Sequence, residues 1–448
     1  MRVVLGAGRS SGRRPLERRR WALGPLVALA LVTGVCTGAI PAPVAGIAPS
    51  WTRAQPAAMG RATPVEAERL AAARTELNRR ATALLRHDRG GWLAGVDPDA
   101  RAFRSAQTTL LANVAAVPLS TWRYTIDPGD EAGTVDRGGA WTVRVGLTYA
   151  LRGADPVPTT RTLVLTFVPR GERWLLAADD RAGPDGERTW RGPWEYGPLL
   201  VRSGRSSIVL AHRTHADRMA VIADAVDAAV PRVSAVVGPR WARRVAVIIP
   251  DDQREMAALV GERLALGKIA AVAVADTVDP STGQARGQRV VINPANLDKL
   301  GPLGRRVVLQ HEVTHVATRG WTGHGTPIWL VEGFADYVGY LGSTLDAVDI
   351  GDELLRQVRA GTWPGRLPVA GDFVGDSPRL SVAYEEAWSA CRLIVARRGI
   401  QGLLRFYKEV GTAADPQGEV DAALHRVLGM GTGEFVAEWR RSVRAGFR

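Results

Sequence analysis

The sequence predicts an α+β protein with two folded units behind an apolar N-terminal segment. Three observations lead to this prediction. The chain opens with a basic run and about twenty uncharged residues, continues with helix patterns followed by strand patterns, and ends with a region that combines short strands with many helices. With 448 residues and 46% apolar content, the chain has enough material for two hydrophobic cores.

The first forty residues are typical of an exported protein. Arginines in residues 1–20 precede the uncharged segment 21–40, which suits either a signal peptide or a membrane helix of about 20 residues. The arginines would hold their end in the cytoplasm, so the remainder of the chain would be extracytoplasmic. Cleavage after Ala39 would secrete the protein, whereas an uncleaved segment would anchor it to the membrane, and both alternatives stay open. Residues 41–63 are rich in Pro and Ala and are expected to form a linker.

Residues 64–182 predict a unit in which helices precede an antiparallel sheet. Helix patterns cover residues 65–87 and 99–117. The strand-like runs that follow are residues 121–127, 140–152, 160–169 and 173–179. Helices followed by a curled sheet form an α+β cone, and this order of elements resembles the nuclear-transport-factor-2-like or cystatin-like fold. Five aromatic residues could line the concave face of this cone, but packing in its core is the favoured interpretation: Trp92, Trp122, Tyr124, Trp141 and Tyr149.

Residues 183–198 are expected to connect this unit to a second one, residues 199–448. Its predicted strands are residues 199–210, 244–250, 269–275 and 288–292. Its predicted helices are residues 213–230, 251–264, 304–318, 328–341, 383–395, 400–410 and 432–444. His212 and His215 are three residues apart and could bind a metal, but the entry to a helix is the favoured interpretation.

Residues 311–315 read His-Glu-Val-Thr-His, inside the helix predicted at residues 304–318. At 3.6 residues per turn, His311 and His315 lie on one face of this helix, so both imidazoles can bind one metal ion. Glu312 lies about 100° further round, where it can reach a water molecule held by the metal. The motif therefore predicts a metal site.

A second predicted helix supplies two carboxylates. Glu332 can complete the site, because zinc usually takes a third protein ligand and a carboxylate oxygen is suitable. Asp336 follows one helical turn later, where it can accept a hydrogen bond from a ligand histidine and fix the orientation of that ring. The predicted metal ligands are thus His311, His315 and Glu332.

These residues and their surroundings, about residues 240–410, resemble the gluzincin branch of the zincin metallopeptidases, which includes thermolysin-like and aminopeptidase-like enzymes. The resemblance implies a zincin-like domain, a Zn²⁺ cofactor and hydrolysis of peptide bonds in peptide or protein substrates. It also implies that His311, His315 and Glu332 bind the zinc, that Glu312 is the general base, and that Asp336 supports a ligand histidine.

The same family places a Tyr or His where it can donate a hydrogen bond to the oxyanion of the reaction intermediate. Tyr384, in the helix predicted at residues 383–395, is the first candidate. His324 is its rival, in the glycine-bearing loop at residues 320–327. Both alternatives stay open.

One departure from the aminopeptidase pattern concerns residues 289–296, where those enzymes carry a glutamate that holds the free amine of the substrate. No acidic residue stands in this segment. Its apolar run predicts a strand that could pair with an extended peptide through backbone hydrogen bonds. We therefore expect an endopeptidase-like site.

Charge and cysteine content exclude two classes of protein. The net charge of +13 comes almost entirely from arginines, which are partly in the leader and elsewhere scattered among acids. This pattern favours a solvated surface, with attraction to an anionic envelope surface, and predicts no nucleic-acid partner. Only Cys36 and Cys391 are present, and the first lies in the exported segment, so the folded part is not a disulfide scaffold.

An alternative from another class is a cell-envelope binding or scaffold protein whose metallopeptidase-like domain has no activity. The complete set of candidate site residues favours an enzyme, because an inactive site would be free to lose its general base, Glu312.

Overall fold

The computed structural model describes residues 63–447 apart from 262–267, 280 and 376. The predicted basic leader (1–20), the apolar segment (21–40) and all but the last residue of the linker (41–63) lie outside the described residues. In the described part of the chain, no helix is both long and apolar enough to span a lipid bilayer.

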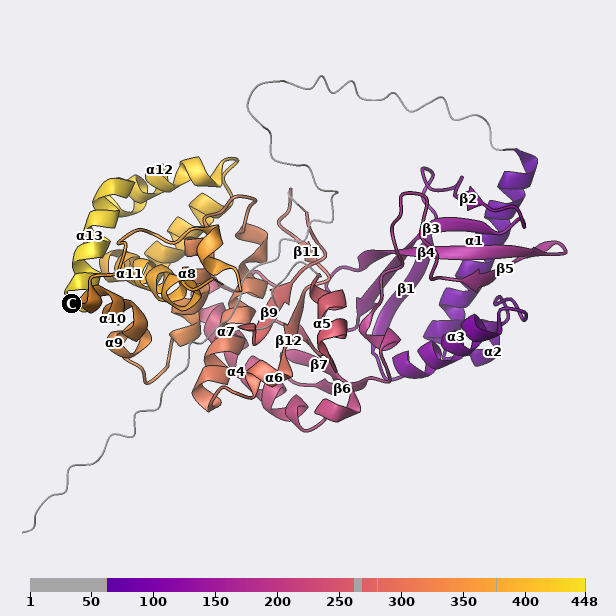
Figure 1. Cartoon of the computed structure of the whole chain (residues 1–448), viewed down its shortest axis with the longest axis horizontal. Helices are drawn as coiled ribbons and strands as arrows, with labels where there is room; N and C mark the ends of the chain where they lie inside the picture. Colours follow the sequence, from indigo (N-terminus) through magenta and orange to yellow (C-terminus); the bar gives the residue numbers. More distant parts are fainter. Residues whose placement is uncertain (1–62, 262–267, 280, 376, 448) are drawn as a thin grey trace, which may run out of the picture.

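The first unit combines three helices with a curled antiparallel sheet (Figure 1). Its helices are α1 (Pro64–Leu85), α2 (Arg89–Leu93) and α3 (Arg101–Val114). Its strands are β1 (Leu119–Thr125), β2 (Thr134–Val135), β3 (Trp141–Leu151), β4 (Thr159–Arg170) and β5 (Arg173–Ala178). The strand order is β1-β3-β4-β5, with β2 paired to β3. All five aromatic residues expected in the core are buried.

The second unit is built on a mixed five-stranded sheet. Its strands, in spatial order, are β6 (Leu200–Ser203), β7 (Ser207–Ala211), β8 (Val245–Ile249), β12 (Arg289–Ile292) and β9 (Ala271–Val274). The three central strands run parallel, and both outer strands run antiparallel to their neighbours. A short hairpin, β10 (Thr277–Val278) with β11 (Ala285–Arg286), lies between β9 and β12 in the chain.

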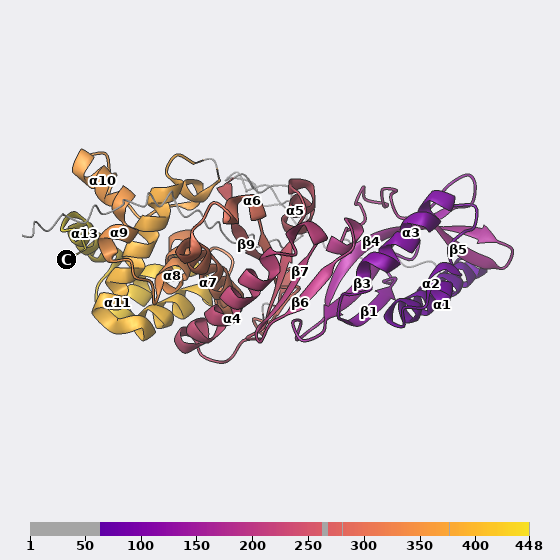
Figure 2. The same cartoon turned by 90° about the horizontal axis from the view of Figure 1, so that it is seen from below.

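Helices pack against one face of this sheet or follow it in the chain, and they make up the rest of the unit (Figure 2). Those interspersed with the strands are α4 (Arg218–Val237), α5 (Gln253–Val260) and α6 (Pro294–Leu297). Those that follow are α7 (Pro302–Thr318), α8 (Ile328–Tyr340), α9 (Ala347–Ile350), α10 (Asp352–Ala360), α11 (Leu380–Gly411), α12 (Pro416–Leu428) and α13 (Thr432–Arg444). A left-handed backbone at Gly399, with φ of 68°, interrupts α11 between the two helices that the sequence predicts there. The prediction of an α+β fold is confirmed.

Two sequence-based expectations about strands are wrong. The single strand expected at residues 199–210 is the hairpin β6–β7, because the Asp227 carboxylate in α4 accepts hydrogen bonds from the backbone N–H groups of Arg205 (2.7 Å) and Ser206 (2.8 Å) and holds a turn there. The run at residues 289–296 was expected to pair with a peptide, but β12 lies between β8 and β9 and has no free edge. The outer strand on this side is β9.

The sheet of the second unit contributes side chains to the cores of both units. Side chains alternate across β7, so Val209 and Ala211 join the core of the second unit while Ile208 and Leu210 join the core of the first. A buried ion pair crosses the same junction, with Arg289 Nη2 2.8 Å from Asp155 Oδ2. The two units are therefore packed through a continuous apolar layer.

Two glycines let α8 approach its neighbours closely. A Cβ on Gly333 would lie 2.3 Å from the Ala387 carbonyl oxygen of α11, and one on Gly339 would lie 3.1 Å from the Val307 carbonyl oxygen of α7. Since no larger residue fits either contact without a shift, these glycines fix the position of α8 between α7 and α11.

A carboxylate holds the segment that covers the start of α11. Asp372 is buried and accepts hydrogen bonds from Arg366 (2.7 and 2.9 Å), Arg379 (3.0 Å) and the Val369 backbone N–H (2.9 Å). The Arg366 hydrogen bonds in particular lower the pKa of Asp372 to about 2. The ionised carboxylate therefore stabilises the fold above its ordinary pKa near 4, and this contribution is lost as the pH falls from about 4 to about 2.

We expect Asp372→Asn to lower the free energy of unfolding by about 1 kcal/mol at pH 7, since solvent around the half-exposed Arg366 screens part of the interaction. Denaturant unfolding at pH 7 and pH 3 measures this free energy. The difference in unfolding free energy between the variant and wild type should be smaller at pH 3 than at pH 7. Asp352→Asn, at an exposed ion pair with Arg356, is the control and should change stability little. An equal difference at both pH values would contradict the assignment.

Candidate metal centre

The two histidines of the His-Glu-Val-Thr-His segment lie on the buried face of α7. His311 and His315 are 0% and 2% exposed, and their Nε2 atoms are 2.9 Å apart. The helix is buried over this stretch because it packs against α4, α8 and the sheet. The spacing of four residues thus directs two ring nitrogens to one point inside the protein.

Glu332 of α8 supplies an oxygen at the same point. Its Oε2 atom lies 3.3 Å from His311 Nε2 and 3.6 Å from His315 Nε2. One ligand atom from each of the three residues lies within 4.8 Å of the others. Among the residues that the structure describes, this is the one cluster of His, Cys, Asp and Glu with metal-binding geometry.

Asp336, one turn further along α8, fixes the orientation of His311. The His311 Nδ1–H donates a hydrogen bond to Asp336 Oδ1 at 2.7 Å. This assignment of the proton leaves the lone pair of Nε2 directed towards His315 and Glu332. Burial opposes a charge on His311, but the Asp336 and Glu332 carboxylates outweigh it and raise its pKa well above the ordinary value, so a metal that binds at Nε2 must displace a proton from this nitrogen.

The donor set fits a zinc ion. Both carboxylate oxygens of Glu332 are buried, and neither has a hydrogen-bond partner among residues 63–447 as described; two imidazole nitrogens lie close to them. Burial acts to raise the pKa of Glu332, but the two histidines lower it to about 2, and burial lowers the pKa of His315 to about 4. Glu332 is therefore ionised and His315 neutral at pH 7, the states in which they bind metal. Two nitrogens and one oxygen form a set that zinc favours.

Glu312 lies beside this cluster and is fully buried. Within the part of the chain that the structure describes, neither of its carboxylate oxygens has a hydrogen-bond partner. Burial raises its pKa to about 8, against the opposing effect of His311. A buried carboxylate with free oxygens and a pKa near neutrality can accept a proton and return it.

Of the two candidate oxyanion donors, the structure brings Tyr384 to the cluster. The Tyr384 ring lies 6.3 Å from the His311 ring, and its hydroxyl is buried with no hydrogen-bond partner among the described residues. Phe373 packs edge-on against it with ring centroids 5.2 Å apart. His324 is exposed, on the loop between α7 and α8.

Comparisons with known proteins give weak matches. No protein-family model matches the chain, and no curated protein matches it in sequence. Among solved structures, an M1 zinc metallopeptidase from Deinococcus radiodurans is 14% identical, covers 73% of this chain and 69% of its own, and has a TM-score of 0.30. A mutant of that enzyme is 12% identical, covers 73% and 70%, and has the same TM-score. TM-scores this low do not establish a relationship, so the identification of a candidate metal site depends on the side chains described above.

Arg319 is a residue of the site that the motif alone does not reveal. It is 2% exposed, and its Nη2 donates a hydrogen bond to the Ala273 carbonyl oxygen of β9 at 2.8 Å. Burial lowers its pKa to about 10, while the charges of Glu312 and Glu332 act on it in the opposite direction. The available signal is spacing, because Arg319 follows Glu312 by seven residues, about two helical turns, at the residue that directly follows α7.

The upstream histidines are separate from the metal cluster. His212 Nε2 lies 3.1 Å from Glu255 Oε1, and His215 Nε2 lies 3.6 Å from Asp251 Oδ1. Each ring has its own carboxylate neighbour, and His212 precedes the 3₁₀ turn Arg213–His215 that leads into α4. This placement agrees with the helix-entry interpretation.

Proposed function

We propose that the protein is a zinc-dependent peptidase of the gluzincin type, acting on peptide or protein substrates. The observation that carries the proposal is the convergence of His311, His315 and Glu332, whose ligand atoms lie within 4.8 Å of one another. The buried Glu312 beside them adds a group suited to proton transfer.

Zinc bound by these three residues would lower the pKa of a water molecule to about 7 and polarise a substrate carbonyl. Glu312 accepts the proton of the attacking water and then donates it to the leaving amine, serving as base and acid in turn. Asp336 keeps the His311 ring in the tautomer that presents Nε2. The Tyr384 hydroxyl donates a hydrogen bond to the oxyanion that forms from the carbonyl.

We expect Tyr384→Phe to lower kcat by about 10²-fold with little change in KM, because the hydroxyl acts on charge that appears only in the transition state. Steady-state kinetics on one peptide substrate would measure kcat and KM of the variant and of wild type. Tyr196→Phe, in the connector, is the matched control and should retain wild-type kcat. A Tyr384→Phe enzyme with wild-type kcat would remove the hydroxyl from the proposed mechanism.

Endopeptidase-like action is the finer proposal. The outer strand β9 consists of Ala271–Val274 and offers no carboxylate for a free amino terminus. Asp276, just beyond it, already accepts a hydrogen bond from Thr159 at 2.6 Å and pairs with Arg161. Peptides with an acetylated amino terminus should therefore be cleaved as well as free ones. Cleavage of free peptides alone would indicate an aminopeptidase.

The basic and apolar start of the chain supports a further proposal, that the protein is exported and acts outside the cytoplasm. Sequencing the amino terminus of the mature protein from cells would distinguish a cleaved signal peptide from a retained anchor. Protease digestion of intact and lysed cells would test export itself.

A scaffold without activity is the second candidate. The burial of the site favours this candidate. His311, Glu312 and Glu332 are each 0% exposed, so none of these side chains is accessible to a substrate in this arrangement. Metal content by mass spectrometry, followed by cleavage of a peptide library, separates the two. Zinc with cleavage supports the peptidase, zinc without cleavage supports the scaffold, and a protein that binds no zinc contradicts the peptidase.

A further inference from the structure

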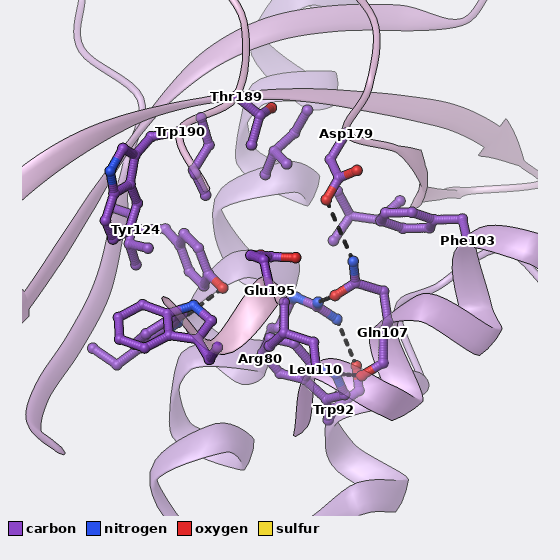
Figure 3. A pocket seen from close by; sticks show the side chains of 16 residues that line it. Arg80, Trp92, Phe103, Gln107, Leu110, Tyr124, Asp179, Thr189, Trp190 and Glu195 are labelled. Carbon is purple, nitrogen blue, oxygen red and sulfur yellow. Dashed lines mark hydrogen bonds between the residues drawn. The ribbon is translucent and has the colours of Figure 1, made fainter. Parts of the chain in front are cut away.

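A cavity in the first unit lies apart from the metal centre (Figure 3). It encloses about 470 Å³, including its opening to solvent, between the three helices and the sheet. Buried aromatic rings, among them Trp92, Trp122 and Tyr124, form its inner wall. The connector contributes Trp190 and Glu195 at the more exposed side. Such a mixture of apolar walls and a few polar groups is typical of a small-molecule site.

One charged group in the cavity is Arg80 of α1, which is 4% exposed. Its guanidinium lies 3.2 Å from the centre of the Trp92 ring and donates a hydrogen bond to the Trp92 carbonyl oxygen at 2.9 Å. A second hydrogen bond goes to the Gln107 side chain. Among the described residues, no carboxylate forms an ion pair with it. A buried cation that no carboxylate contacts directly is costly, so the cavity favours a direct contact between Arg80 and an anionic group.

Glu195 can supply the opposite charge: its side chain is 23% exposed. Burial raises its pKa to about 7, against the opposing effect of Arg191, so a cationic ligand group nearby would favour its ionised form. Figure 3 shows its carboxylate beside Arg80 and Tyr124 in the cavity. Its nearest cation is Arg191, at 3.6 Å, and that guanidinium already donates to both carboxylate oxygens of Asp179. In the described part of the chain, no hydrogen bond reaches the Glu195 carboxylate. This group can therefore accept hydrogen bonds from a ligand.

We propose that this cavity binds a small zwitterion with an apolar body, of the class of free aliphatic α-amino acids. The carboxylate of the ligand faces Arg80, its ammonium group faces Glu195, and its side chain packs against the aromatic wall. A ligand with a carboxylate alone leaves Glu195 beside a like charge, and a ligand with an amine alone adds a second cation beside Arg80. The proposal does not depend on the metal centre.

Isothermal titration calorimetry on the full chain tests the ligand class with three probes of similar size. L-leucine carries both charges, 4-methylpentanoate lacks the ammonium group, and 3-methylbutylamine lacks the carboxylate. We expect L-leucine to bind and each analogue to bind at least about tenfold more weakly, as for the loss of one charged hydrogen bond. Equal binding of either analogue, or no binding of L-leucine at millimolar concentration, overturns the proposal.

A variant at the exposed side of the cavity tests the site. Glu195→Gln should weaken L-leucine binding at least about tenfold and leave the affinity for 4-methylpentanoate no weaker than in wild type. Glu131→Gln, the same change at a surface ion pair of the same unit, should bind L-leucine as wild type does. Thermal unfolding of both variants checks the fold. Glu195 is preferred to Arg80 because replacing Arg80 also disturbs the core. Wild-type binding of L-leucine by Glu195→Gln overturns the assignment.

Discussion

Glu312→Gln should bind zinc as wild type does and hydrolyse peptides about 10³-fold more slowly. The amide has nearly the shape of the carboxylate, so the metal ligands keep their positions, but it cannot accept a proton from the attacking water. The effect should fall on kcat, because Glu312 acts on a group that changes during the reaction.

Metal content by mass spectrometry and peptide hydrolysis by the same preparation are the measurements. Glu434→Gln, an exposed glutamate on α13, is the matched control and should retain full activity. Equal hydrolysis by Glu312→Gln and wild type would remove Glu312 from the mechanism. Loss of zinc in Glu312→Gln would instead indicate that this carboxylate is itself a ligand.

Glu332→Ala should weaken zinc binding by more than about 10²-fold and abolish hydrolysis. The substitution removes one of three protein ligands, and the loss of a supporting residue behind a ligand alone costs about 10- to 100-fold in affinity. Competition with a coloured chelator measures the affinity directly.

Thermal unfolding gives an independent measurement of the same site. A ligand that binds the folded state raises the unfolding midpoint, so zinc should raise it for wild type and have little effect on Glu332→Ala. His425→Ala, an exposed histidine on α12, is the control and should respond to zinc as wild type does. An undiminished response in Glu332→Ala would exclude the proposed ligand set.

The metal cluster could be anticipated because helical periodicity is a local property. Once α7 and α8 are expected to be helices, the spacing of four residues places His311 and His315 on one face of α7. The same spacing places Glu332 and Asp336 on one face of α8. Only the contact between the two helices had to be supplied by the fold. The α13 helix, with its polar and apolar residues at helical spacing, was likewise predicted at residues 432–444.

The features that the sequence did not predict depend on contacts between distant parts of the chain. The turn between β6 and β7 requires the carboxylate of Asp227, which a strand pattern does not reveal. The position of β12 inside the sheet follows from pairing with both β8 and β9, and no apolar run distinguishes an inner strand from an outer one. Arg80 and Glu195 meet in one cavity only because the connector folds back over the first unit.

The sheet of the second unit also packs against the first unit, so part of its apolar surface depends on the amino-terminal half for burial. In a chain trimmed to begin at residue 199, Ile208, Leu210 and Ala246 would lose the partners that now bury them and would meet water together. The same trimming would leave Arg289 without Asp155. Apolar side chains exposed beside an unpaired arginine favour aggregation, so the amino-terminal unit is a fixed part of the structure that holds the metal cluster.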